Sequence, residues 1–371
     1  MADRSPVKVL HVVGARPNFM KVAPVMRTMA GREGRFEQRL VHTGQHYDEA
    51  MSQVFFDELG IAPPDDNLEV GSGSHAAQTA EILLRFEPVL LAFRPDWLLV
   101  VGDVNSTMAA TLVASKVGIR TAHVEAGLRS FDRGMPEEIN RLVTDALADL
   151  LLTPSPDADA NLRREGVAES RIRQVGNVMI DTLARNLERA RARHAPRRLG
   201  VEPRRYVYVT LHRPSNVDER GSLAAIVDCL VDVSRRAPVV FPVHPRTRQR
   251  LADFSLVDTL TSGGGVRLVE PVGYLDSISL AEAACCVLTD SGGLQEETTF
   301  LRVPCLTLRP NTERPITITD GSNRLTTVDR LRADIDGAMG RRESAEPLPC
   351  PALWDGKASE RIADALIDLP A

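Results

Sequence analysis

The sequence contains few cysteines, and their placement argues against two kinds of site. Five cysteines occur among 371 residues, with no CxxC pair and no Cys/His spacing of the kind that binds zinc. We therefore predict no metal site. An odd, sparse set of cysteines is typical of a reducing compartment, so we expect a cytoplasmic protein. Cys285 and Cys286 lie in an apolar stretch, where a buried thiol behaves as a small hydrophobic group.

The sequence also lacks an excess of positive charge and any long apolar run. The formal net charge is −5 and the pI is near 6.0, which gives no support for a nucleic-acid-binding surface. Every apolar run is too short, or too interrupted, to span a bilayer. The N-terminal residues carry a short apolar strand and no signal-peptide pattern. We expect neither a nucleic acid nor a membrane as a partner.

A dinucleotide fingerprint is missing from the first strand–turn–helix unit. Val7–Val13 is apolar almost throughout, as in a buried parallel strand, and a glycine-containing turn follows. Pro17 suits the first turn of a helix, which has helical spacing as far as Pro24 allows. Such a unit can hold an anion at the helix N-terminus, but GxGxxG is absent, so we predict no cofactor. Arg16 and Lys21 are candidate anion-binding cations, and each also fits the role of a solvated charge.

Three acidic residues lie within one strand–helix–strand–helix stretch, from Val101 to Arg141. Asp103 and Glu125 follow apolar strands, and Glu137 falls in the first turn of a helix. Ligands of open α/β sheets bind beyond the carboxyl ends of the strands, so these acids should line a cleft. Each acid alone also fits a structural role, Asp103 as a helix cap and Glu137 in an i,i+4 ion pair with Arg141. Three acids on neighbouring loops favour the catalytic interpretation.

A second anion site is predicted in the C-terminal half. A strand ends at Thr289, and Asp290, Ser291, Gly292 and Gly293 then open a helix. Backbone N–H groups that no side chain covers can approach phosphate oxygens there, and the helix dipole favours the negative charge. The Ser291 hydroxyl adds a donor.

Further residues of this half complete a nucleotide-binding pattern. Glu296 or Glu297, on the following helix, is placed to accept both hydroxyls of a ribose. Arg314 offers the bidentate geometry that suits a diphosphate. His212 and His244 each follow an apolar strand, where a side chain can face a cleft. A structural role is an open alternative for each of these residues taken alone.

Strands and helices alternate in both halves, which predicts an α/β protein of two doubly wound parallel domains. Residues 194–205 are rich in Arg and Pro and lack a hydrophobic period, which predicts the connection between the two domains. We expect an N-terminal domain over 1–178 with the catalytic acids and a C-terminal nucleotide-binding domain over 200–355. Residues 356–371 are predicted to form a terminal helix that packs back across the domains.

The motifs resemble those of one known family over nearly the whole chain. They are GARPNFMK, VGDVNST, HVEAGLRSFDRGMPEEINR, QVGN, TLHRPSN, FPVHPRT, TDSGGLQEE and the ERP that begins at Glu313. In this order and spacing they are similar to the non-hydrolysing UDP-N-acetylglucosamine 2-epimerases. The resemblance implies two Rossmann-like domains of the glycosyltransferase-B type, an active site in the interdomain cleft, and a homodimer.

The resemblance also implies a mechanism and residue roles. The substrate is a UDP-sugar, and UDP leaves by anti elimination to give a 2-acetamidoglucal before it adds back with inversion at C2. Two faces of C2 require two acid/base groups, or one group with a relay. The implied catalytic residues are Asp103, Glu125, Glu137 and His212. The implied substrate-binding residues are Arg16, Lys21, Arg141, His244, Ser291, Gly292, Gly293, Glu297 and Arg314.

The sequence departs from the family at two places that build an activating second UDP-N-acetylglucosamine site in many bacterial members. Residues 45–49 and 73–78 lack the arginines found there, which puts activation by substrate in doubt. The GARPNF and GDVNST variants are also similar to relatives that act on UDP-2,3-diacetamido uronic acids. That substrate is one alternative, and a glycosyltransferase of the same fold that uses a UDP-sugar donor is another.

Overall fold

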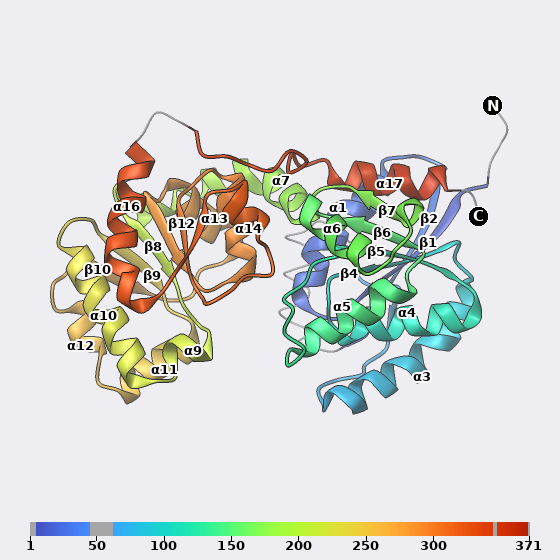
Figure 1. The fold of residues 1–371 in the computed structure, drawn as a ribbon, viewed down its shortest axis with the longest axis horizontal. Coiled ribbons are helices and arrows are strands. Elements are labelled where there is room, and N and C mark those ends of the chain that lie inside the picture. Colours follow the sequence, from blue (N-terminus) through green and yellow to red (C-terminus); the bar gives the residue numbers. More distant parts are fainter. Residues whose placement is uncertain (1–4, 45–61, 344–346, 370–371) are drawn as a thin grey trace. The chain divides into compact units, whose positions relative to one another are not determined.

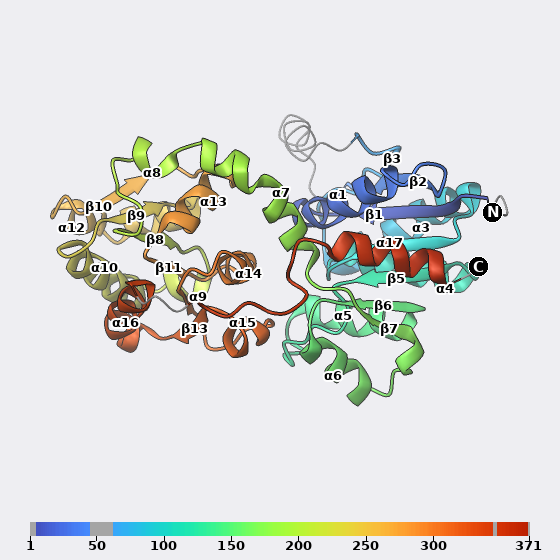
Figure 2. The same ribbon diagram turned by 90° about the horizontal axis from the view of Figure 1, so that it is seen from above.

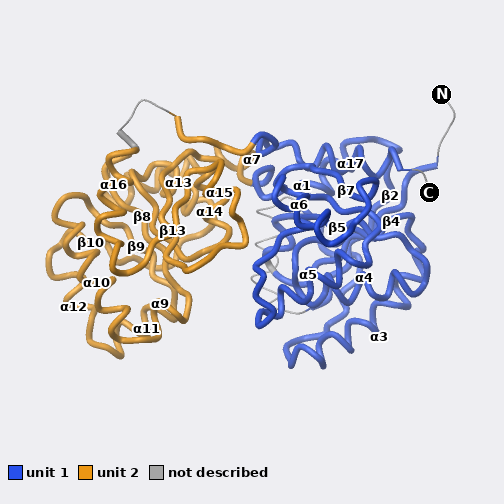
Figure 3. Tube along the Cα trace, in the orientation of Figure 1, with its two compact units in different colours: residues 1–182, 352–371 blue, residues 183–351 orange. Residues whose placement is uncertain are grey.

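A computed structural model describes residues 5–44, 62–343 and 347–369 (Figure 1). The chain divides into two compact units, coloured separately in Figure 3. Unit 1 comprises residues 1–182 and 352–371, and unit 2 comprises residues 183–351. Each unit is built around one parallel sheet, which confirms the predicted fold class of two doubly wound α/β domains. Residues 45–49, where the first departure from the family was noted, lie outside the described residues.

Unit 1 contains a seven-stranded sheet in the order β3-β2-β1-β4-β5-β6-β7, with every pair parallel. The strands are β1 (Val7–Val13), β2 (Phe36–His42), β3 (Asp66–Asn67), β4 (Trp97–Val101), β5 (Arg120–Val124), β6 (Leu150–Thr153) and β7 (Ile172–Gln174). The chain winds outward from β1 in one direction and from β4 in the other. The carboxyl ends of β1 and β4 therefore flank the switch point at which such sheets bind ligands.

Helices cover both faces of this sheet, so its central strands are buried and apolar. The helices are α1 (Arg16–Ala30), α3 (His75–Phe93), α4 (Asn105–Val117), α5 (Pro136–Leu147), α6 (Pro156–Arg164), the 3-10 turn η1 (Glu169–Arg171), α7 (Val178–Ala192) and α17 (Ala358–Asp368). Helices α1 and α17 pack against each other on one face (Figures 1 and 2). Helices α3, α4 and α5 form a row on the other face. The division between the units falls within α7.

One local expectation is wrong: α1 does not stop at Pro24 but continues to Ala30. A proline lacks an N–H group, so the carbonyl of Met20, four residues earlier, loses its helical partner. The hydroxyl of Thr182 donates to that carbonyl at 2.6 Å. A side chain from α7 thus satisfies the group that the proline leaves open.

Unit 2 contains a six-stranded parallel sheet in the order β10-β9-β8-β11-β12-β13. The strands are β8 (Val207–Thr210), β9 (Val239–Pro242), β10 (Val266–Val269), β11 (Cys286–Thr289), β12 (Cys305–Leu308) and β13 (Asn323–Thr326). Here the switch point lies between β8 and β11. The carboxyl ends of these two strands carry His212 and Asp290.

Alternate residues of β8 supply the cores on the two faces of this sheet. Val207 and Val209 pack beneath α10 and α16, while Tyr208 packs on the other face with α13 and α14. The helices of unit 2 are α8 (Ala195–Arg198), α9 (Pro214–Val217), α10 (Arg220–Ser234), α11 (Pro245–Asp253), α12 (Val257–Thr261), α13 (Tyr274–Ala283), α14 (Gly292–Phe300), α15 (Ile316–Thr319), the 3-10 turn η2 (Val328–Arg330) and α16 (Leu331–Glu343). Within the described part of the chain, no helix is long and apolar enough to cross a bilayer.

Candidate active site

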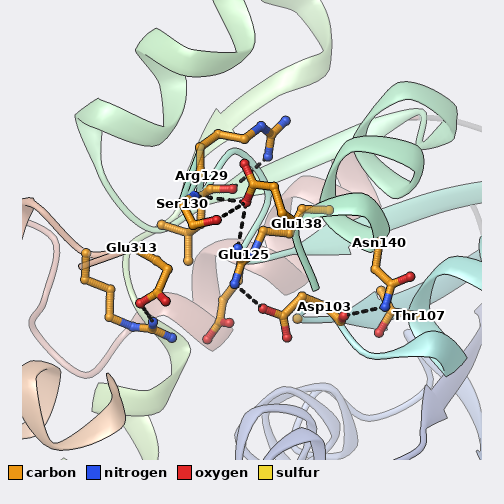
Figure 4. Close-up of polar contacts among 12 residues, drawn as sticks. Asp103, Thr107, Glu125, Arg129, Ser130, Glu138, Asn140 and Glu313 are labelled. Carbon is orange, nitrogen blue, oxygen red and sulfur yellow. Dashed lines mark hydrogen bonds and ion pairs between the residues drawn. The ribbon is translucent and has the colours of Figure 1, made fainter. Parts of the chain in front are cut away.

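Asp103 lies directly beyond β4, at the switch point of unit 1, and is held through both its side chain and its backbone (Figure 4). Arg141 donates to its carboxylate at 2.5 Å, and Asn140 donates to its carbonyl at 2.9 Å. The cap residue of α4 is Val104, not Asp103. Both of these contacts come from α5, the helix on which Glu137 lies.

Glu125 follows β5 and forms a buried ion pair with Lys21 of α1. Their side chains lie 2.5 Å apart, and Glu125 is 6% exposed. The backbone of Glu125 has φ of 70°, a left-handed conformation that costs a residue with a side chain about 1–3 kcal/mol and is concentrated at functional sites. The carboxylate oxygen Oε1 is buried without a hydrogen-bond partner among the described residues. This carboxylate therefore presents one oxygen whose hydrogen-bonding capacity is not used within the described protein.

Glycine is required between β4 and Asp103 for two reasons. Gly102 has φ of +68°, and a side chain there would meet the Lys21 ammonium at 2.9 Å. The close approach brings the Lys21–Glu125 pair next to the backbone that carries Asp103. Two carboxylates, each with its own cation, thus occupy the carboxyl ends of neighbouring strands.

The two glutamates at the start of α5 have different environments. Glu137 is exposed, whereas Glu138 is 2% exposed and accepts hydrogen bonds from Ser130, Phe131 and Arg141 (Figure 4). Burial alone would raise the pKa of Glu138, but the bonds from Ser130 and Arg141 outweigh it and lower that pKa. Arg141 forms its ion pairs with Glu138 and Asp103. The i,i+4 pair between Glu137 and Arg141, given above as the structural alternative, is therefore replaced by the i,i+3 pair with Glu138.

Glu138 was missed at the sequence level, although a signal existed. It shares a face of α5 with Arg141 and Asp145, at i, i+3 and i+7, and all three are buried. Burial would lower the pKa of Arg141, but the charges of Asp103 and Glu138 raise it instead. Glu138 and Arg141 are therefore both ionised, and Arg141 fixes the Asp103 side chain.

At the anion site predicted at the start of α1, the Asn18 side chain holds the backbone in place. Helix α1 begins at Arg16, and the Asn18 side chain accepts hydrogen bonds from the N–H groups of Gly14 and Ala15 at 3.2 and 3.0 Å. The same side chain donates to the carbonyl of Val101 at 3.0 Å. Asn18, another residue that sequence reasoning missed, thereby joins the end of β4 to the first turn of α1.

In unit 2, Asp290 organises the end of β8 from the end of β11. It is fully buried, accepts from the backbone N–H groups of His212 and Arg213, and lies 2.9 Å from Nδ1 of His212. Asn216 donates to the same carboxylate at 3.0 Å. Burial would raise the pKa of Asp290, but the bond from His212 and the backbone bonds lower it, so Asp290 is ionised.

His244 lies beside His212, with ring centroids 5.5 Å apart. It caps α11, where its Nδ1 accepts from the N–H of Arg246 at 3.2 Å. Partial burial, and then the charge of His212, lower the pKa of His244. The structure thus brings together the two histidines that were predicted from separate strands.

The glycine loop and its neighbours also form one group in unit 2. Ser291 is the cap residue of α14, and a side chain at Gly292 would meet the Arg314 guanidinium at 3.3 Å. Arg314 forms an ion pair with Glu296 at 2.8 Å. Glu297 is buried, and burial followed by the Glu296 charge raises its pKa to about 8. The predicted diphosphate and ribose contacts therefore adjoin one another.

Two comparisons of sequence support the family resemblance. The family model described as UDP-N-acetylglucosamine 2-epimerase matches residues 29–367. A UDP-N-acetylglucosamine 2-epimerase homolog of Methanococcus maripaludis is 46% identical over 365 residues, covering 98% of this chain and 100% of that protein. A UDP-2,3-diacetamido-2,3-dideoxy-D-glucuronate 2-epimerase of Pseudomonas aeruginosa is 39% identical, covering 98% of this chain and 100% of that protein.

Solved structures agree with the fold and with the family. The UDP-GlcNAc 2-epimerase of Methanocaldococcus jannaschii, in complex with UDP-GlcNAc and UDP, matches with a TM-score of 0.82 and 40% identity, covering 98% of this chain and all of that chain. The glycosyltransferase SnogD of Streptomyces nogalater, 14% identical with a TM-score of 0.55, shares the two-domain fold alone. On the sequence and structure matches together, this chain belongs to the UDP-N-acetylglucosamine 2-epimerase family.

Proposed function

We propose that this protein interconverts UDP-N-acetylglucosamine and UDP-N-acetylmannosamine by epimerisation at C2. The observation that carries the proposal is the pair of cation-bound carboxylates, Asp103 with Arg141 and Glu125 with Lys21, at the carboxyl ends of the neighbouring strands β4 and β5. Family membership supplies the reaction class, and these carboxylates supply groups that the reaction requires.

The chemistry explains why more than one acid is needed. The hydrogen on C2 of a pyranose is not acidic, so its removal is feasible only when UDP departs from C1 in the same step. Anti elimination leaves a 2-acetamidoglucal and UDP, and a proton must then reach the opposite face of C2 before UDP adds back. Each positioned acid or base contributes ~10² to 10⁴-fold to such a step.

We assign the proton transfers to unit 1. Asp103, Glu125 and Glu137 are the proposed acid/base groups, and the unpartnered buried oxygen of Glu125 supports a role in direct proton transfer. Arg16 and Lys21, with the buried Arg141, are the proposed cations for the reacting centre and the diphosphate. A cation next to the leaving group stabilises negative charge as it develops.

We assign nucleotide binding to unit 2. The Ser291 hydroxyl and the N–H groups of Gly292 and Gly293 are the proposed diphosphate donors, because these residues lie at the start of α14 and glycine has no side chain to cover its N–H group. Glu297 is the proposed ribose contact, and Arg314 the proposed further diphosphate contact. Two histidines of unit 2 are also part of the proposal. His212 is a proposed catalytic residue, and His244 is a proposed substrate contact.

A second substrate is kept because one relative favours it. The Pseudomonas aeruginosa relative is named for UDP-2,3-diacetamido-2,3-dideoxy-D-glucuronate, and it matches this chain over nearly its full length. The same elimination and re-addition would apply, since the C2 chemistry does not depend on the group at C6. A glycosyltransferase reaction has less support, because the matched family is named for epimerases.

Assembly and location are further parts of the proposal. We propose a homodimer, and an apolar stripe on α3 supports it: Ala77, Ala80, Leu84 and Leu91 are exposed on one side of that helix, with Leu84 71% exposed. We propose a cytoplasmic location, because none of the five cysteines forms a disulfide, as is typical of a reducing compartment. The reaction as written needs no cofactor.

Proton NMR of the purified protein with UDP-N-acetylglucosamine in D₂O tests the reaction. Formation of UDP-N-acetylmannosamine with deuterium at C2 is the expected result. A parallel sample with the UDP-diacetamido uronic acid tests the second substrate. Free N-acetylmannosamine and UDP would show a hydrolysing enzyme, and two unchanged spectra would refute the proposed function.

A further inference from the structure

A buried histidine outside the predicted site bridges the two strands that carry the acids. His123 lies on β5 with its ring fully buried. Its Nε2 atom is 2.8 Å from the carbonyl oxygen of Gly102, and its Nδ1 atom is 2.6 Å from Oδ1 of Asp145 on α5. Both ring nitrogens therefore face oxygen atoms.

The partners of His123 determine where its protons lie. A carbonyl oxygen only accepts, so Nε2 must carry a hydrogen and donate it to Gly102. The second oxygen of Asp145 accepts from the N–H of Gly127 at 3.0 Å and lies 2.7 Å from the Arg129 guanidinium. Two donors on one oxygen, one of them a guanidinium, favour the ionised form of Asp145, and the pKa of Asp145 is lowered in this environment. A carboxylate oxygen only accepts, so Nδ1 also carries a hydrogen. The ring is then an imidazolium.

The surrounding charges compensate a buried imidazolium. Arg129 is held on its other side by both oxygens of Glu165, at 2.8 and 2.7 Å. His123, Asp145, Arg129 and Glu165 thus form a chain of alternating charge with no net charge. Burial would raise the pKa of Asp145, but the charge of His123 and the bonds to its carboxylate lower it. A buried ion is tolerated only when it is paired and hydrogen-bonded in this way.

The Gly102 carbonyl immediately precedes Asp103 in the chain, so whatever holds it orients the acid. The N–H of Gly102 is fixed by the carbonyl of Val124 at 3.1 Å, and its carbonyl is fixed by His123. Asp103 is the next residue, and its own carbonyl is held by Asn140. The backbone that leads from β4 to Asp103 is therefore held at the N–H and the carbonyl of Gly102 and at the carbonyl of Asp103.

We propose that His123 is a positioning residue that donates from both ring nitrogens, clamps the Gly102 carbonyl and so holds Asp103 in place for proton transfer. Its effect on turnover rests on the proposed function. Its protonation state does not, because that state follows from the contacts within unit 1 alone.

His11 provides a matched comparison within the same sheet. It lies on β1 with its ring fully buried, and its Nε2 contacts the Gln38 amide oxygen at 3.0 Å. Its Nδ1 has no hydrogen-bond partner among the described residues. Burial lowers the pKa of His11 to about 4, so this ring is neutral at neutral pH. The two strand histidines should therefore give opposite signals in one experiment.

Nitrogen-15 NMR of the full chain labelled at histidine tests the protonation state. We expect both ring nitrogens of His123 to carry protons at neutral pH, while His11 keeps one unprotonated nitrogen. The His123 and His11 signals are assigned by their loss in His123→Gln and His11→Gln. In Asp145→Asn the Nδ1 proton of His123 should be lost. A single protonated nitrogen on His123 in the wild-type protein would overturn the imidazolium.

Kinetics separate a positioning role from a purely structural one. In His123→Gln we expect kcat to fall about 10²-fold, the typical cost of a displaced reacting group, with KM changed only a few-fold. His11→Gln should keep the wild-type kcat. An unchanged kcat in folded His123→Gln would overturn the positioning role.

If the wild-type protein turned over neither UDP-sugar, the proposed function would fail while the NMR result stood. If His123→Gln does not fold, Asp145→Asn supplies the same kcat comparison.

Discussion

At the scale of the residue, the environments of the acids assign them different tasks. Asp103 is held by Arg141 and Asn140 within unit 1, whereas the nucleotide-binding groups are proposed in unit 2. Replacing the carboxylate by its amide keeps the shape but removes the proton acceptor. We expect Asp103→Asn to lower kcat by ~10² to 10⁴-fold, the usual contribution of a positioned acid or base, while UDP affinity stays within a few-fold. Steady-state kinetics and calorimetry of UDP binding measure the two quantities, and equal losses in both would make Asp103 a binding residue.

The raised pKa of Glu297 predicts that nucleotide affinity depends on pH. Its pKa is about 8 in the free protein, because burial and the Glu296 charge destabilise the carboxylate. Ribose hydroxyls donate to a carboxylate, so binding favours the ionised form and releases a proton. Below about pH 8 the affinity should therefore fall by up to about tenfold per pH unit, and above that pH it should level off.

Calorimetry of UDP binding between pH 7 and pH 9 measures this dependence, and titrations in two buffers of different ionisation enthalpy measure the released proton. Glu297→Gln is the matched control, because it keeps the side-chain length and cannot ionise. The variant should bind UDP more weakly and without this dependence on pH. The same slope in both proteins would assign the effect to another group.

At the scale of the element, the sequence predicted the alternation of strands and helices, the two parallel α/β domains and the family, because these follow from short-range apolar patterns and contiguous motifs. The sequence did not predict which polar and charged side chains would form ion pairs and hydrogen bonds. Lys21 and Glu125 form an ion pair although they are 104 residues apart in the sequence. Thr182 donates to the Met20 carbonyl, which Pro24 leaves without a helical partner, from 162 residues away. His123 was missed for the same reason, since its partners become neighbours only once β4, β5 and α5 have packed.

The terminal helix α17 illustrates such a long-range contact and can be tested for stability. Asp181 of α7 accepts hydrogen bonds from the N–H groups of Ala358 and Ser359, at 3.0 and 2.7 Å, and so caps α17 from another element. Removing a buried acceptor leaves these two donors unsatisfied. We expect Asp181→Ala to lower the free energy of unfolding of unit 1 by about 1–3 kcal/mol.

Denaturation followed by tryptophan fluorescence measures this change, because both tryptophans, Trp97 and Trp354, belong to unit 1. Asp364→Asn is the control, since its ion pair with Arg32 is exposed and should contribute less than about 1 kcal/mol. Equal effects of the two substitutions would mean that the Asp181 cap does not stabilise α17.

At the scale of the whole molecule, the proposed homodimer makes the apolar stripe of α3 the surface to alter. Leu84 is 71% exposed and shares one side of α3 with other exposed apolar side chains, an arrangement that marks interaction surfaces. A charge placed there would have to be buried in a dimer formed through α3, and an unpaired buried charge is strongly unfavourable. We therefore expect Leu84→Glu to convert the dimer to a monomer in light scattering coupled to size-exclusion chromatography. Ile318→Glu, at an exposed apolar residue of unit 2, should leave the mass unchanged. A wild-type mass of one chain would refute the dimer, and a dimeric Leu84→Glu variant would move the interface away from α3.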